Sequence, residues 1–148
     1  MSNYKFEPKD LNFEAKVRDS FSRQKVMQTI GANIIKVLPG EVEIALPFCG
    51  DLTQQNNYLH AGIVTTIVDS ACGYAAFSLM EAGADVLTIE FKINFLSPAL
   101  GEIFIAKGLV TKPGKNITVC LGDVIAKNGD KEKIIATMLA TIMTIRVA

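Results

Sequence analysis

Residues 54–80, QQNNYLHAGIVTTIVDSACGYAAFSLM, decide the fold of this 148-residue chain. Residues 62–81 are apolar enough for a long buried helix, about 30 Å at 1.5 Å per residue, and Gly83 follows as a stop signal. Asp69 interrupts the apolar run, where an ionised carboxylate is costly unless it is paired or used. The only histidine, His60, lies nine residues earlier at the predicted loop-to-helix junction. The stretch therefore predicts a central helix that carries a functional carboxylate.

The sequence before this helix predicts one helix and one β-hairpin. Residues 10–30 have apolar side chains at amphipathic-helix positions, which are Phe13, Val17, Phe21, Met27 and Ile30. Residues 34–38 are mostly apolar and lead through a Pro-Gly pair into residues 42–48, whose hydrophobicity alternates, a pattern typical of a hairpin. A polar loop over residues 49–59 then leads to the central helix.

Four strands are predicted after the central helix. The first has apolar side chains at every second residue, so we expect one buried and one wet face; these side chains are Leu87, Ile89, Phe91, Ile93 and Phe95. Residues 102–111, 116–126 and 134–147 are further strand candidates. All the joins are short, which favours antiparallel pairing. The sequence predicts an α+β domain of order α-β-β-α-β-β-β-β, with an antiparallel sheet wrapped around the central helix.

Length and composition exclude several classes of protein. A chain of 148 residues predicts a single domain over residues 1–148, with residues 1–30 as its N-terminal amphipathic helical segment. The 15 basic and 15 acidic residues cancel, so we expect no nucleic acid or membrane partner. Three cysteines within apolar sequence indicate reduced thiols and a cytoplasmic location. One histidine and no CxxC argue against a metal site, and no segment reaches the roughly 20 apolar residues of a membrane span.

The start of the central helix and Asp69 supply two halves of an acyl-transfer site. The first-turn N–H groups near Gly62 suit a carbonyl oxygen that develops negative charge. Asp69 lies on the same face, in a strip of small and polar residues with Thr65, Thr66 and Gly73. It is about 10 Å from Gly62 along the axis, whereas reacting groups must come within roughly 3.5 Å. Two copies with antiparallel central helices would bring the halves together, so we expect an obligate dimer.

The motifs at these positions point to a known family. Gln54, the run His60-Ala61-Gly62, Asp69 and residues 88–99 (TIEFKINFLSPA) resemble the PaaI-like family of hotdog-fold acyl-CoA thioesterases. The family pattern is Asn or Gln, then His-Gly-Gly, then Asp or Glu nine residues after the histidine. This chain has alanine at the first glycine of that pattern and pairs its glutamine with an aspartate. The resemblance implies a hotdog fold, hydrolysis of an acyl-CoA without metal or redox cofactor, and a homodimer or homotetramer.

The resemblance also implies a role for each site residue. Asp69 attacks the thioester or activates water, while the N–H of Ala61 polarises the thioester carbonyl and His60 helps to hold that turn. Gln54 holds the attacking water or orients the carboxylate, and Thr88 supports the site with its hydroxyl. The substrate-binding positions that the resemblance implies are Gly62, Ser97, Lys115 and Asn116, the last three near the CoA nucleotide.

Alternative interpretations stay open from the sequence. Asp69 could form a structural ion pair, for instance with Lys92 or Arg146, and His60 could serve only as a cap. Cys72 could act as a nucleophile, although a buried free cysteine usually packs as a small hydrophobe. The alternative functions are a non-catalytic acyl-CoA sensor and a hotdog hydratase or dehydratase. The sequence does not choose the acyl group, nor between a nucleophilic and a general-base role for the aspartate.

Overall fold

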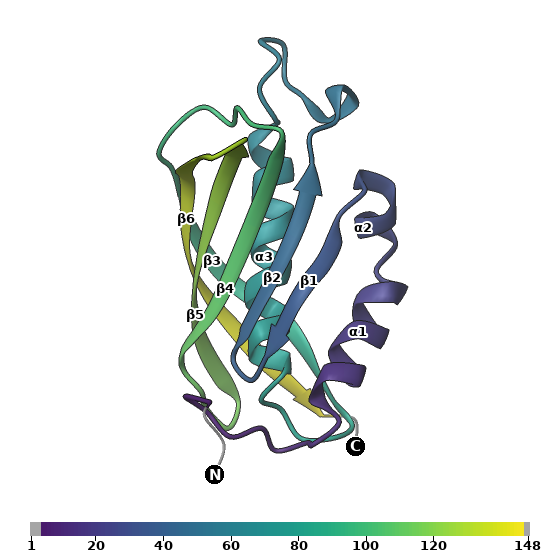
Figure 1. The fold of residues 1–148 in the computed structure, drawn as a ribbon. Helices are drawn as coiled ribbons and strands as arrows, with labels where there is room; N and C mark the ends of the chain where they lie inside the picture. Colours follow the sequence, from purple (N-terminus) through teal and green to yellow (C-terminus); the bar gives the residue numbers. More distant parts are fainter. Residues whose placement is uncertain (1–3, 147–148) are drawn as a thin grey trace.

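A curved six-stranded sheet covers one side of the central helix α3, which spans Ala61–Phe77 (Figure 1). The computed structural model describes residues 4–146. In chain order the other elements are α1 (Phe13–Arg23), α2 (Lys25–Ile30), β1 (Asn33–Leu38), β2 (Glu41–Pro47), the 3₁₀ helix η1 (Gly50–Leu52), β3 (Ala84–Phe95), β4 (Ile103–Lys112), β5 (Ile117–Asn128) and β6 (Lys131–Arg146). All neighbouring strands are antiparallel, in the order β1-β2-β4-β5-β6-β3. The predicted α+β architecture is confirmed.

One hydrophobic core lies between the sheet and α3. Its fully buried strand residues include Ile44, Phe104, Cys120, Met138 and Ile142. Gly108 of β4 sets the spacing, because a Cβ there would lie 2.3 Å from the carbonyl oxygen of Ala71. A methyl group at this position would push the sheet away from the helix. None of the helices within residues 4–146 is both long and apolar enough to span a membrane.

The N-terminal segment predicted as one helix over residues 10–30 is two helices. The apolar positions explain the break, because Phe21 and Met27 are six residues apart and one straight helix could not bury both. Gln24 adopts an extended conformation (φ −80°, ψ 96°) between the helices. Met27 and Ile30 then reach the core together with Phe21. In Figure 1, α1 and α2 lie along the β1 side of the sheet.

Helix α3 ends at Phe77, earlier than the predicted end at residue 81. Ser78, which is fully buried, ends it. The Ser78 hydroxyl donates to the carbonyl oxygen of Ala75 at 2.6 Å and accepts the N–H of Gly40 at 2.8 Å. Gly40 occupies the β1–β2 turn with φ +80°, a conformation that favours glycine. A hydrogen bond between distant segments therefore sets the end of the helix.

Strand β3 does not keep a single apolar face, contrary to the prediction. Its register against β6 shifts between Thr88 and Glu90, and directly opposed residues of paired strands share a face. Leu87 lies opposite an outward-facing residue of β6, whereas Phe91 lies opposite a buried one. Both side chains are nevertheless exposed in the single chain, Leu87 by 55% and Phe91 by 42%. Most of the side chains that the alternation predicted to be buried are therefore exposed in one chain, whereas Ile93 packs against the core.

Strand β3 is antiparallel to its partner, as the short joins predicted, but that partner is not the next strand along the chain. Because β4 uses its two edges for β2 and β5, β3 pairs with β6 and forms an edge of the sheet. Residues 96–102 connect β3 to a strand that is not its neighbour. The last predicted strand is present as β6 up to Arg146, and its predicted final residue, Val147, lies outside the described residues. The result is a twelve-residue edge strand beside α3.

Candidate active site

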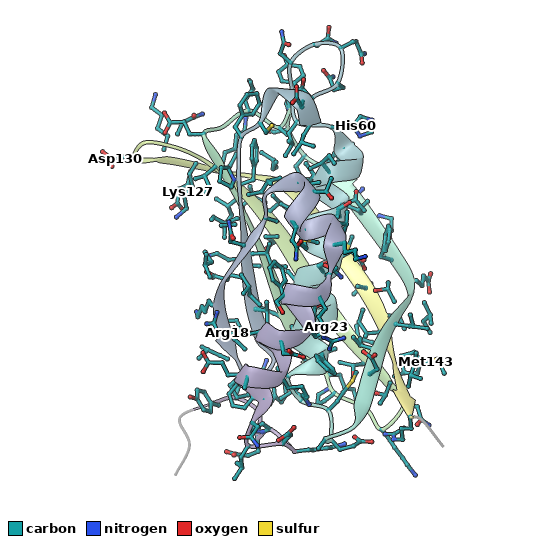
Figure 2. All side chains as sticks on the ribbon, turned by 90° about the vertical axis from the view of Figure 1, so that its right-hand side faces the viewer. Arg18, Arg23, His60, Lys127, Asp130 and Met143 are labelled. Atoms are coloured by element: carbon teal, nitrogen blue, oxygen red, sulfur yellow. The ribbon has the colours of Figure 1, made fainter. Side chains whose placement is uncertain are left out.

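His60 organises the start of α3. It is the N-cap residue, and its Nδ1 accepts the N–H of Gly62 at 2.8 Å. This hydrogen bond uses the lone pair of Nδ1. A Cβ at residue 62 would lie 3.0 Å from Nδ1, which accounts for glycine there. Figure 2 shows His60 at one end of the molecule, far from Met143 near the other end.

Ala61 supplies the available donor of the first helical turn. Gly62 donates to the ring of His60, and the N–H groups of Ile63 and Val64 donate to the His60 carbonyl oxygen at 2.9 and 3.1 Å. Within residues 4–146 the N–H of Ala61 has no such acceptor, and the residue is exposed. Ala61 belongs to the right-handed helix, so its methyl group causes no backbone strain. An unpaired donor therefore stands at the positive end of the helix dipole.

Gln54 and Ser97 lie beside that donor. Together with Ala61 they border a cavity of about 230 Å³, whose other walls are largely apolar. The side-chain oxygen of Gln54 accepts the N–H groups of Asn56 and Tyr58, which holds the loop in a tight turn. Among residues 4–146 the amide nitrogen of Gln54 has no acceptor, so it is available to another group. The structure thus brings three of the predicted residues together at the start of α3.

Asp69 and Thr88 form a second group on the exposed face of α3. The Thr88 hydroxyl donates to Asp69 Oδ1 at 2.8 Å. Burial raises the pKa of the Asp69 carboxyl, and the hydrogen bond from Thr88 acts in the opposite direction. Neither cation considered as an ion-pair partner reaches it, because Arg146 pairs with Glu81 and Lys92 donates to Asn94. Among the described residues, no salt bridge involves this carboxylate.

A cleft of about 400 Å³ opens next to Asp69 between α1, α3 and β3. Ser20, Gln24 and Tyr74 contribute polar side chains to its wall. These three residues were not among those that the sequence patterns predicted for the site. The sequence did contain an indication for Gln24. This residue lies between Phe21 and Met27, where the spacing of the apolar residues no longer fits one face of a single helix.

The two groups do not meet within one chain. Eight residues separate Ala61 from Asp69, about 12 Å along the helix axis. The cavity at the helix start and the cleft at Asp69 share no lining residue. A thioester carbon could not lie within roughly 3.5 Å of the carboxylate while its oxygen reached the donor. One chain therefore holds the two candidate half-sites apart from each other.

Lys115 and Asn116 lie away from both half-sites. Arg146 donates to the carbonyl oxygen of Lys115 at 2.6 Å and to Asn116 Oδ1 at 2.9 Å, and it also pairs with Glu81. This cluster is at the β4–β5 turn, which Figure 1 shows at the opposite end of the molecule from the loop before α3. The structure therefore does not bring Ser97 close to these two residues within one chain.

Cys72 is packed in the core between α3 and β5. It is fully buried, and a Cβ at Gly122 would lie 2.8 Å from its Sγ. Burial raises the pKa of the Cys72 thiol well above its ordinary value, which disfavours the thiolate. The packing role is therefore favoured over the nucleophilic one. Within the described part of the chain, no group of three or more metal-ligating side chains is present.

Comparison with known proteins places this chain in a family. The model of the thioesterase superfamily matches residues 56–133, which include α3 and strands β3 to β5. A Saccharolobus solfataricus protein named as a candidate esterase is 30% identical over 116 residues, which are 78% of this chain and 75% of that protein. The chain belongs to the thioesterase superfamily, and it is a thioester hydrolase.

Solved structures agree with this assignment. A thioesterase family protein from Silicibacter pomeroyi is similar with a TM-score of 0.90 and 55% identity, over 91% of this chain and 99% of that chain. The PaaI protein of the E. coli phenylacetic acid degradation operon is similar with a TM-score of 0.81 over 93% and 94% of the two chains. Its identity is 17%, so this likeness concerns the fold alone. The predicted PaaI-like hotdog fold is confirmed.

Proposed function

We propose that the chain hydrolyses an acyl-CoA to a free carboxylic acid and CoA, at a site shared by two subunits. The observation that carries this proposal is the half-buried Asp69 carboxylate, which opens onto a cleft and has a hydroxyl rather than a cation as its side-chain partner. The unpaired N–H of Ala61 supports the same chemistry from the other half-site. We further propose that residues 1–148 act as one domain.

In the proposed reaction, Asp69 takes a proton from water as the water oxygen attacks the thioester carbon. The carbonyl oxygen becomes negative and accepts a hydrogen bond from the Ala61 N–H of the second subunit, a donor worth about 2.7–4 kcal/mol in comparable sites. The carbon–sulfur bond then breaks, and CoA leaves as a thiolate that gains a proton. In the alternative route Asp69 attacks the carbon itself, and water hydrolyses the resulting anhydride.

The remaining residues position these groups. Thr88 holds the Asp69 carboxylate through its hydroxyl, and His60 keeps the helix start in the conformation that exposes the Ala61 donor. The free amide nitrogen of Gln54 orients the attacking water or the carboxylate. Gly62 lets the substrate approach the helix start closely. Ser97, Lys115 and Asn116 contact the CoA nucleotide, with contributions from both subunits.

We propose a homodimer in which the two α3 helices run antiparallel and the β3 edges meet. The support is the twelve-residue β3 edge and its uncovered apolar side chains, because long apolar edge strands usually find a partner. The outer face of the sheet carries a second apolar patch, formed by Leu87, Leu121, Leu139 and Met143. This patch supports association of two dimers into a homotetramer. Three free thiols support a cytoplasmic location.

The test of the reaction is thiol release from a panel of short, medium, branched and aromatic acyl-CoAs. Asp69→Asn is expected to lower kcat by about 10²–10⁴-fold, the usual contribution of a general base. Asp123→Asn, on the outer face of the sheet, is the matched control and should keep wild-type activity. Equal rates for wild type and Asp69→Asn would overturn the mechanism. Acyl-CoA binding with no thiol release would favour a sensor instead.

The oxyanion donor can be removed with little change to the fold. Ala61 is the first residue of α3, where proline is well tolerated, and His60 has an extended backbone that suits a following proline. Ala61→Pro replaces the N–H hydrogen with a carbon of the proline ring and is expected to lower kcat by about 10²–10³-fold. Ala61→Ser keeps the N–H and serves as the control. Full activity of a folded Ala61→Pro variant would exclude this donor.

A further inference from the structure

The cleft beside Asp69 continues along α3 to a buried tyrosine. Tyr74 lies five residues further along the helix, about 7.5 Å at 1.5 Å per residue, and its side chain is 5% exposed. Gly73 leaves open space on the way, since a Cβ there would meet no neighbouring atom within 4 Å. The cleft therefore extends from the carboxylate to a wall formed where α1 faces α3.

That wall is polar because hydrogen-bonding side chains of α1 and α3 meet there. Ser20 Oγ lies 3.2 Å from the hydroxyl oxygen of Tyr74, and Ser70 donates to Gln24 Oε1 at 3.1 Å. With this oxygen occupied, Gln24 Nε2 has no acceptor among the described residues. The hydroxyl pair also keeps acceptor sites, because each hydroxyl has two lone pairs. The wall thus offers an amide donor and hydroxyl acceptors to an occupant.

The break between α1 and α2 places this donor. Gln24 is the extended residue at the break, and its side chain crosses to Ser70 of α3. The break between α1 and α2 lets Met27 reach the core. The same break therefore also holds the side-chain amide of Gln24 against α3. A polar residue at this position is consistent with a role at the cleft as well as with the turn itself.

The charged side chains that line the cleft are acidic, and Arg23, whose charge also acts on Tyr74, is paired with Asp19. Asp69 and Asp85 both line it, and none of its lining residues is a lysine or an arginine. An acyl chain that ends in a carboxylate would be repelled. A chain that ends in a methyl group would leave the polar wall without partners once water is displaced. A terminal hydroxyl, which both donates and accepts, matches the wall.

Resting on the proposed thioesterase function, we propose that this cleft is the acyl pocket. Gln24 and Tyr74 then select acyl-CoAs whose acyl chain ends in a hydroxyl over the same chain ending in a methyl group. Both residues act as specificity determinants that contact the far end of the acyl group, and the thioester carbon lies at Asp69.

The test compares kcat/KM for hexanoyl-CoA and octanoyl-CoA with their ω-hydroxy derivatives. For at least one chain length, wild type is expected to prefer the ω-hydroxy form by about tenfold, as for one or two well-placed hydrogen bonds. Gln24→Leu and Tyr74→Phe should bring this ratio close to one by slowing the hydroxylated substrate. Gln28→Leu, which changes an exposed glutamine of α2 outside the cleft, should keep the wild-type ratio.

The outcomes separate this proposal from the proposed function. Hydrolysis of all four substrates with a ratio of one or less, or a ratio that neither variant changes, would overturn the pocket assignment and leave the thioesterase intact. Tyr74→Phe removes a single oxygen, so it tests the wall even if Gln24→Leu disturbs the helix break. If wild type releases no thiol, calorimetry with non-hydrolysable S-hexyl-CoA and S-(ω-hydroxyhexyl)-CoA replaces the assay. About tenfold tighter binding of the hydroxylated thioether would support the pocket, and equal affinities would refute it.

Discussion

Two opposing influences set the protonation of Asp69. Burial raises the pKa of its carboxyl, and the hydrogen bond from Thr88 lowers it. The proposed reaction needs the ionised form, so activity should fall as the pH decreases through this pKa. Because the pKa is raised overall, the loss should begin at a higher pH than for a solvent-exposed aspartate. The burial of Asp69 should therefore set the lower pH limit of activity, which can be measured.

Thr88→Val should move this acidic limit to higher pH. The variant removes a hydrogen bond that favours the ionised carboxylate, so the pKa of Asp69 rises further. The value of kcat/KM at neutral pH should also fall by about 2–10-fold, as for the loss of one hydrogen bond. The measurement is the pH profile of kcat/KM with the best acyl-CoA of the panel. Thr141→Val, on the outer face of the sheet, is the control. If the acidic limb of the Thr88→Val profile coincided with that of Thr141→Val, the proposed role of Thr88 in setting the pKa of Asp69 would be contradicted.

At the scale of elements, local pattern and tertiary contact contribute differently. The sequence located α3, because its apolar run and His60 N-cap are local features. The break at Gln24 was predictable from the six-residue spacing of Phe21 and Met27, although the helical pattern on either side concealed it. The end of α3 was not predictable, since Ser78 meets a glycine 38 residues away.

Ser78→Ala should destabilise the protein by about 1–3 kcal/mol, because the N–H of Gly40 would remain buried without an acceptor. The free energy of unfolding, measured by chemical denaturation at one protein concentration, tests this. Ser22→Ala is the matched control: the hydroxyl of this exposed serine donates only to the Asp19 carbonyl oxygen of its own helix, and its loss should cost less than about 0.5 kcal/mol. Equal destabilisation by the two changes would show that the contact between Ser78 and the β1–β2 turn does not hold the helix end.

At the scale of the whole molecule, the proposed division of the site between two subunits would also account for the apolar surface that one chain exposes. The β3 edge and the strip of α3 from Ala61 to Asp69 are incompletely covered in one chain. A second copy would cover both surfaces and bring a helix start to the carboxylate. In this arrangement, the exposed apolar surface and the separation of Ala61 from Asp69 would both follow from the need for a second copy of the chain.

A mixed dimer of Asp69→Asn and Ala61→Pro subunits should recover activity. In a shared site, one of its two sites combines both defects and the other combines two intact halves. Co-expression with two affinity tags allows the mixed species to be purified, and its thiol release should be about half that of wild type. Each variant alone should remain nearly inactive. No recovery in the mixed dimer would mean that one chain supplies both groups.

The sequence by itself determined the class of the protein and the positions of its candidate residues. Hydrophobic period, helix caps and the spacing from Gln54 through His60 to Asp69 are properties of short segments, so they can be seen before folding. The tertiary structure decided the pairing of β3 with β6, the uncovered faces of that strand and the polar wall formed by Gln24 and Tyr74. It also decided that the Ala61 donor and the Asp69 carboxylate lie too far apart to act together in one chain. These features depend on contacts between distant segments, which local pattern does not encode.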